Sequence, residues 1–128
     1  MIQGQVSARR EAVIPVRVLA HDGGFADVEA VIDTGFSGFL TLPPARIEGL
    51  RLPFVETRTY ALGDQRAVPF FLHLATIAWN DQERPILVLA TDGQPLVGMS
   101  LLHGYHLFMD VVDGGAVTIE PRPGGNVV

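Results

Sequence analysis

The stretch EAVIDTGFSGFLTLP, residues 29–43, places an aspartate and two glycines directly after an alternating apolar run. The alternation ends at Ile32 and has the period of a half-buried strand, so Asp33 is predicted at the carboxyl end of that strand. Gly35 then allows the chain to turn sharply against neighbouring backbone. The pattern therefore predicts a carboxylate presented at the tip of a loop.

The Asp-Thr-Gly tripeptide also fits a purely structural interpretation. An aspartate between two strands often accepts a hydrogen bond from the backbone N–H two residues further on, which forms an Asx turn. The residues that follow, 39–43, resume a strand that Pro43 ends. A chemical role for Asp33 therefore needs supporting motifs elsewhere in the chain.

Composition limits the classes of protein that this chain can represent. With 128 residues, of which 48% are hydrophobic, we expect one compact domain spanning residues 1–128. The formal net charge is −5, and the pair Arg9-Arg10 is the longest basic run, so no nucleic-acid partner is expected. There is no cysteine, which excludes disulfides, thiolate metal sites and a cysteine nucleophile.

The location of the protein is inferred from the absence of long apolar segments. The polar start lacks the apolar stretch of a signal peptide, and the longest aliphatic run, residues 86–90, is far shorter than the ~18 residues of a membrane span. We expect a soluble, cytoplasmic protein without a membrane partner.

Short strands separated by turn residues dominate the rest of the sequence. Alternating segments at residues 13–20 and 25–33 flank the turn HDGG and predict a hairpin. Their regular spacing favours an all-β barrel or sandwich. Two segments carry a short helical signal, residues 43–50 and 98–105, and Gly104 is expected to end the second. Further β-rich runs are residues 67–79, 84–90, 105–112 and 116–121, and a loose tail is expected at 121–128.

Apolar residues divide into an expected core and possible walls of a cleft. Trp79 is expected to pack at the end of a strand, and Phe36, Phe39, Tyr60 and Leu62 are candidates for the cleft walls. The expected core comprises Ile14, Val16, Val18, Val28, Ala30, Ile32, Leu40, Leu42, Phe71, Ile77, Leu87, Leu89, Leu101 and Leu102.

Three segments together resemble one protein family. Residues 30–43 resemble the catalytic loop of the retroviral-type (retropepsin-like) aspartic proteases, in the version of small bacterial and archaeal single-domain members. Residues 95–111, PLVGMSLLHGYHLFMDV, resemble the family's two apolar residues and glycine that lead into a short helix. Residues 59–71 occupy the place of the flap hairpin. Order and spacing match from about Val13 to Ile119.

The resemblance implies an all-β, single-domain retropepsin-like acid-protease barrel with one short helix, and a homodimeric peptidase. Such hydrolysis uses two carboxylates that share one proton, one activating a water and the other polarising the scissile carbonyl. This chain has a single Asp-Thr-Gly, so the second carboxylate should be Asp33 of another subunit, related by a two-fold axis. By resemblance, Thr34 would grip the partner loop and Gly35 would let its backbone approach the substrate.

The same resemblance assigns the remaining site residues. Leu96, Val97 and Gly98 would pack beneath the catalytic loop. The expected partner is a peptide or protein substrate, which would add as an extended strand under the flap. Neither a metal nor a cofactor is expected. Substrate-binding positions are Phe36, Tyr60, Leu62, Gly63 and Asp64.

Three features depart from the family pattern. Phe36 stands where viral members have Ala and pepsin-like ones have Ser, and it cannot hydrogen-bond the carboxylate; Ser37 could supply a hydroxyl instead. Met99 and Ser100 stand where viral members have a charged residue that ties the helix to the interface, so a different dimer interface is expected. The terminal segments, residues 1–6 and 118–121, could pair as the strands that lock viral dimers do, but neither has a strong strand pattern.

Other chemistries fit the sequence less well. The segment GFSGF lacks the last glycine of a serine-nucleophile elbow, because Phe39 stands there. His103 and His106 have the spacing of metal ligands on a helix, but no carboxylate completes a ligand set, and His73 is expected to be a strand histidine. The alternative function is a catalytically inactive dimerisation or peptide-binding module. An intact Asp-Thr-Gly favours the enzyme, because a scaffold could use Asn or Ser in that turn.

Overall fold

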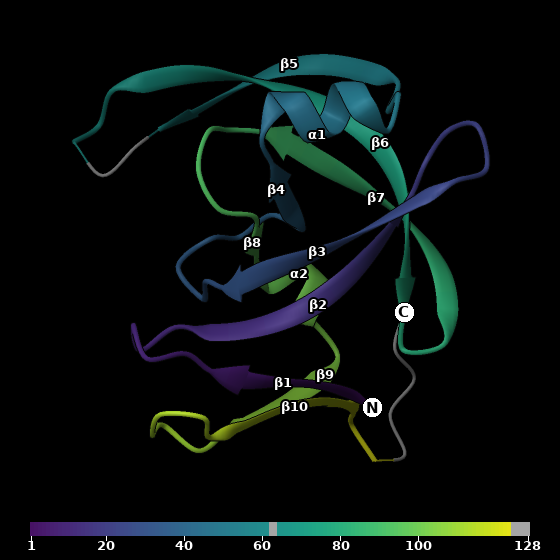
Figure 1. Cartoon of the computed structure of the whole chain (residues 1–128). Coiled ribbons are helices and arrows are strands. Elements are labelled where there is room, and N and C mark those ends of the chain that lie inside the picture. The colour runs from purple at the N-terminus through teal and green to yellow at the C-terminus, as the bar shows by residue number, and fades with distance from the viewer. Residues whose placement is uncertain (62–63, 124–128) are drawn as a thin grey trace.

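The computed structural model describes residues 1–61 and 64–123, which form ten strands and two short helices (Figure 1). Within these ranges, no helix is long and apolar enough to cross a membrane. The strands are β1 (Ile2–Val6), β2 (Ala12–Leu19), β3 (Phe25–Ile32), β4 (Leu40–Leu42), β5 (Phe54–Ala61), β6 (Ala67–Trp79), β7 (Gln82–Ala90), β8 (Leu96–Val97), β9 (Tyr105–Met109) and β10 (Ala116–Pro121); the helices are α1 (Pro44–Gly49) and α2 (Met99–Leu102).

All ten strands belong to one sheet that closes on itself. Their order is β5-β6-β7-β4-β8-β3-β2-β1-β10-β9, and an additional pairing of β6 with β2 closes the six central strands into a barrel. The hairpin β5–β6 projects from one end of this barrel, and β1, β10 and β9 extend the sheet on the other side (Figure 1). The predicted β barrel is confirmed, in a mostly-β domain that also has short helices.

Local sequence signals place most strand boundaries correctly. The hairpin of β2 and β3 forms as predicted, with Val16 opposite Val28, and β6 and β10 occupy the predicted ranges. Asn80 and Asp81 both adopt positive φ angles, 51° and 65°, which is the conformation of a tight two-residue hairpin turn. Gly104, with φ 88°, follows the end of α2 as expected.

The expectation of one short helix is wrong, because the part of the chain that the structure describes forms two. α2 is the helix implied by the resemblance, whereas α1 begins at Pro44 directly after β4. Proline is favoured at the first helical position, where its missing N–H costs nothing. The buried side chain of Ile47 then holds this single turn against the barrel.

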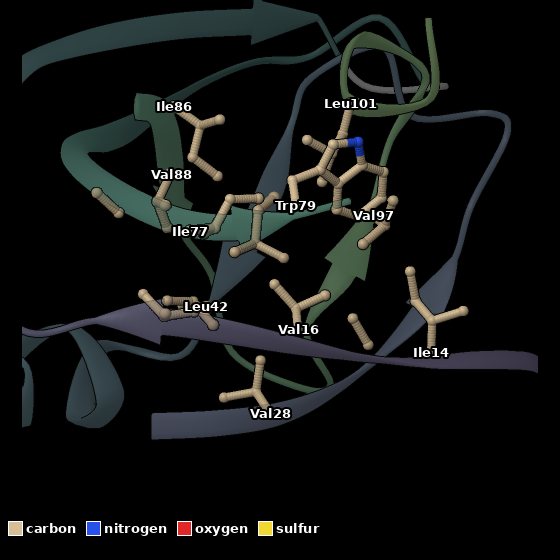
Figure 2. Packing of buried hydrophobic residues seen from close by; sticks show 14 of the residues in the cluster. Ile14, Val16, Val28, Leu42, Ile77, Trp79, Ile86, Val88, Val97 and Leu101 are labelled. Carbon is tan, nitrogen blue, oxygen red and sulfur yellow. The ribbon is translucent and has the colours of Figure 1, made fainter. Parts of the chain in front are cut away.

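The core fills the barrel interior. Figure 2 shows Val16 and Val28 from the β2–β3 hairpin facing Ile77 from β6, with the indole of Trp79 beside Leu101. Trp79 is buried at the end of β6, as predicted. Of the predicted core residues, the following are buried: Ile14, Val16, Val18, Val28, Ala30, Leu40, Leu42, Ile77, Leu89, Leu101 and Leu102.

Three residues predicted to lie in the core are not fully buried. Ile32 and Leu87 are only partly buried, and Phe71 is 58% exposed. The pairing of β6 with β7 begins at Leu72, so Phe71 lies on the part of β6 that extends beyond the barrel with β5 as its partner. Adjacent strand residues point to opposite faces, and Leu72 is the fully buried one.

Candidate active site

Asp33 stands directly after the carboxyl end of β3. β8 pairs with this end of β3 in parallel, with Val31 opposite Leu96 and Ile32 opposite Val97. The Asp33 N–H continues that ladder by donating to the carbonyl oxygen of Val97 at 2.9 Å. Because β8 also pairs with β4, the loop between β3 and β4 is held at both of its ends by one short strand.

The carboxylate of Asp33 is oriented by its own loop. Gly35 N–H donates to Asp33 Oδ1 at 2.9 Å, and Phe36 N–H donates to the Asp33 carbonyl oxygen at 3.1 Å. The Asx turn that the tripeptide predicts is therefore present. Within the described residues Asp33 Oδ2 accepts no hydrogen bond, and the side chain is only partly buried. One carboxylate oxygen is thus fixed while the other remains available for a ligand.

Gly98 supports this loop from below. A Cβ atom added to Gly98 would lie 2.3 Å from the Gly38 carbonyl oxygen and 2.6 Å from that of Phe36, so only glycine allows the observed approach. Backbone hydrogen bonds join the same segments: Gly98 N–H donates to Phe39 O at 3.0 Å and Met99 N–H donates to Phe36 O at 2.7 Å. The predicted packing of this segment beneath the loop is confirmed.

The short helix α2 has no charged residue of its own, and contacts with neighbouring elements hold it in place. The Ser100 hydroxyl donates to the carbonyl oxygen of Ser37 in the Asp33 loop. Arg84 on β7 lies with its guanidinium 3.4 Å from the carbonyl oxygens of Ser100 and Leu101, and 5.5 Å from the ring of Phe39. The charge that steadies α2 therefore comes from β7. Phe39 faces this side and not the cleft beside Asp33, so its assignment as a cleft wall is wrong.

A cleft of about 390 Å³ opens beside Asp33. Its volume falls in the range of sites that accept a small ligand or a side chain, roughly 300–1,000 Å³. Two candidates from the sequence, Phe36 and Tyr60, line it together with Asp33 and Gly35. Ser37 and Leu96, which the sequence placed in and beneath the Asp33 loop, line it as well. The remaining lining residues, which the sequence did not assign to the site, are Thr41, Ala61, Phe70, Leu89 and Thr91.

Strand alternation explains why these residues were missed. Leu89 was expected in the core, yet it is buried against the cleft while its neighbour Val88 belongs to the core cluster. Thr41 carried a usable signal, because it is a polar residue between two buried leucines. It is 4% exposed, and its Oγ1 accepts a hydrogen bond from Leu96 N–H at 2.9 Å. A buried hydroxyl needs such a partner.

Other candidate residues lie away from the cleft or outside the structure. Thr34 is exposed and does not line the cleft. Asp64 is exposed on the hairpin and accepts hydrogen bonds from Arg66. Leu62 and Gly63, predicted to bind substrate, lie outside the described residues.

Within the described residues, neither the Ser37 hydroxyl nor a histidine completes a further chemical site. Ser37 lines the cleft, but within the described ranges its hydroxyl makes no hydrogen bond to Asp33. His73 lies in β6 as predicted, with Nδ1 3.1 Å from the carbonyl oxygen of Leu52. Among residues 1–61 and 64–123 there is no group of three or more His, Cys, Asp or Glu side chains that could hold a metal ion.

Comparison with known proteins identifies the fold. No protein-family model and no curated protein matches the sequence. The structure is similar to that of a retropepsin-like aspartic protease from Rickettsia conorii, with a TM-score of 0.54 over 94% of this chain and 90% of that chain, at 10% sequence identity. The chain therefore has the retropepsin-like fold, and its predicted resemblance is confirmed at the level of structure.

Proposed function

We propose that this protein is a homodimeric aspartic endopeptidase in which Asp33 from each of two subunits forms the acid–base pair. The observation that carries the proposal is the position of Asp33: it lies at the edge of an apolar cleft, with one carboxylate oxygen held by Gly35 and the other without a hydrogen bond in the described residues. The retropepsin-like fold supports it.

The proposed reaction needs two carboxylates and one water. The ionised Asp33 takes a proton from the water as its oxygen attacks the scissile carbonyl carbon, and the protonated Asp33 of the partner gives its proton to the carbonyl oxygen. The tetrahedral intermediate then collapses. A proton passes from the first Asp33 to the amide nitrogen, the C–N bond breaks, and one diol proton returns to the second Asp33. Two carboxyl groups this close cannot both ionise, so the pair holds a single proton at rest.

The cleft suggests which side chains the substrate would present. Phe70, Leu89 and Leu96 contribute apolar surface, and Tyr60 brings the β5–β6 hairpin to the same cleft as Asp33. An extended peptide between the hairpin and the Asp33 loop would bind through main-chain hydrogen bonds, with alternate side chains entering pockets. We therefore propose a preference for an apolar side chain next to the scissile bond.

The test is cleavage of a mixed library of unstructured peptides from pH 3 to 8 at high protein concentration. Asp33→Asn keeps the acceptor oxygen of the Asx turn and removes the acid–base function, so the fold should survive and cleavage should be lost. Asp22→Asn is the matched control, because Asp22 Oδ1 accepts from Gly24 N–H in the same i to i+2 pattern at an exposed turn. Retained cleavage by Asp33→Asn would refute the mechanism.

The second candidate function is a catalytically inactive module of the same fold that dimerises or binds peptides. The Asx turn favours it, because Asp33 already has a structural role in its loop. A dimer that binds library peptides without cutting them at any pH would establish this alternative. A strict monomer that cleaves peptides in an Asp33-dependent way would instead rule out the shared site.

A further inference from the structure

Phe36, the residue directly after the Asp-Thr-Gly motif, has its ring inserted between two glycines. A Cβ atom added to Gly38 would lie 2.5 Å from Cζ of the ring and 2.6 Å from Cε1, and one added to Gly98 would lie 2.5 Å from Cδ2. Contacts this short are essentially never seen for a Cβ atom. The ring therefore occupies the space that side chains at both positions would need, and bare backbone lies against it on two sides.

Backbone hydrogen bonds fix the main chain around the same ring. Phe36 N–H donates to Asp33 O at 3.1 Å, and Met99 N–H donates to Phe36 O at 2.7 Å. Ser100 N–H donates to Gly38 O at 3.1 Å. The ring, its own backbone and the two glycines thus form one packed unit that has little freedom to move.

The open side of the Phe36 ring is a wall of the cleft beside Asp33. Phe36 is partly buried, and it lines that cleft together with Asp33 and Gly35. A side chain that enters the cleft next to Asp33 therefore meets this ring. The ring carries no hydrogen-bonding group, so it can offer the side chain only apolar contact and a limit on its size.

A second wall of the cleft is held less firmly. Tyr60 and Phe70 line it with their rings edge to face and their centroids 5.8 Å apart. They come from β5 and from the part of β6 before Leu72, and within the described residues these two segments pair only with one another. A hairpin that is joined to the barrel at one end can shift to fit a ligand. The Phe36 wall has no such freedom.

We propose that Phe36 determines the size of the substrate side chain that the cleft beside Asp33 accepts. The inference rests on the proposed function, because it concerns the apolar side chain next to the scissile bond. A fixed wall sets how large a side chain fits, whereas a wall that can move adjusts to the side chain. Among the residues of the cleft, the ring clamped between Gly38 and Gly98 is the fixed wall.

The test compares peptides that are identical except for the residue next to the scissile bond, which is alanine, leucine, phenylalanine or tryptophan. Phe36→Ala removes the ring and should raise the ratio of kcat/KM for the tryptophan peptide to that for the leucine peptide by about tenfold or more. A difference of one methylene in an apolar pocket already changes kcat/KM by roughly 10–200-fold. Phe36→Leu keeps part of the apolar bulk in the same place and should give a smaller increase.

Gly38→Ala changes the same wall in the opposite direction. The three atoms nearest to the new Cβ all belong to the Phe36 ring, so the ring must move, and its open side faces the cleft. This variant should therefore lower the ratio of tryptophan to leucine peptide. When Phe36→Ala is also present the clash is gone, so the double variant should have the ratio of Phe36→Ala alone. A general loss of loop stability would neither reverse the sign nor disappear in this way.

Phe39→Ala is the matched control. Phe39 belongs to the same loop and is partly buried, but its ring faces Arg84 on the side away from the cleft. Its loss should lower the stability of the protein and leave the ratio of the two peptides unchanged. A readout without activity uses the same peptides with a fluorescent label and the Asp33→Asn protein. Their affinities, measured by fluorescence anisotropy, should change with Phe36→Ala in the same sense as kcat/KM.

The outcomes distinguish this inference from the proposed function. If Phe36→Ala and Phe36→Leu lower kcat/KM by the same factor for every peptide, the size limit is overturned and the peptidase stands. Should Phe36→Ala fail to fold, Phe36→Leu and Gly38→Ala decide the question alone, because their ratios must move in opposite directions. Peptides that bind with the expected change in preference but are never cleaved would refute the peptidase and leave the role of Phe36 standing. Peptides that are neither bound nor cleaved would overturn both.

Discussion

Gly98→Ala tests whether the Asp33 loop rests directly on the β8–α2 segment. The new Cβ would lie 2.3 Å from the Gly38 carbonyl oxygen and 2.5 Å from Phe36 Cδ2. Ordinary van der Waals contacts of a Cβ begin at 3.4 Å, so the loop or the segment beneath it must move by about 1 Å. The Gly98 φ of −105° is accessible to alanine, so the penalty is steric and does not come from its own backbone angle.

The expected loss of stability can be worked from these contacts. Forcing an extra methyl into a close-packed site costs about 1–3 kcal/mol. Displacement also weakens the hydrogen bonds from Gly98 N–H to Phe39 O and from Met99 N–H to Phe36 O, each worth about 0.5–1.5 kcal/mol. We expect a decrease in unfolding free energy of about 2–4 kcal/mol. A shift of this size beneath Asp33 should also lower kcat/KM roughly 100-fold, if the protein cleaves peptides as proposed.

Urea unfolding followed by circular dichroism measures the first effect, and peptide cleavage under folding conditions measures the second. Gly49→Ala is the matched control, because a Cβ there meets nothing within 4 Å and alanine favours the α1 helix by up to about 1 kcal/mol. A Gly98→Ala protein that loses less than about 0.5 kcal/mol would refute the close packing of loop on segment. Unchanged cleavage by a clearly destabilised variant would refute the link between that packing and Asp33.

Three further predictions concern the core, the cleft and the surface. Ile77→Ala should cost about 2–5 kcal/mol in urea unfolding, whereas Phe71→Ala should cost much less, because Ile77 is fully buried and Phe71 is 58% exposed; equal losses would place Phe71 back in the core. Thr41→Val should lower the free energy of unfolding by about 1–3 kcal/mol, because the backbone N–H that donates to the Thr41 hydroxyl is left without a partner. Unchanged stability in the same measurement would exclude this role. The hydrogen bond from Arg17 lowers the pKa of Asp27, so the ionised Asp27 stabilises the fold above its unfolded pKa, and this contribution is lost as the pH falls through about 4 and below. In Asp27→Asn, the free energy of unfolding should therefore fall slightly less steeply with acid than in the wild type. The difference should be small because the ion pair is exposed.

Strand positions were predictable because local patterns decide them. The turn residues near Asn80 and Asp81 and the alternation along residues 67–79 reproduce β6 from its first residue to its last. Gly104 marks the end of α2 because a left-handed conformation suits glycine. These signals depend on a few neighbouring residues, and they act before any long-range contact forms.

Which face of a longer strand is buried could be assigned only from the tertiary structure. Alternation says that Leu72 and Phe71 point to opposite sides, but only the point where β7 begins to pair with β6 decides which side is covered. In the same way, Leu89 lines the cleft and Val88 packs in the core, because one face of β7 borders the cleft and the other borders the core. Burial on a given face depends on elements that are distant in the sequence.

By itself the sequence determined the loop chemistry at Asp33: a strand end, an Asx turn and a glycine at position 98 with the family's spacing. The tertiary structure alone decided what surrounds that carboxylate. The cleft with Tyr60 and the contact of the β7 arginine with α2 arise where strands far apart in the chain are brought together by the closure of the sheet. The physical reason is that backbone preference acts over a few residues, whereas packing and charge act between surfaces that exist only once the barrel has closed.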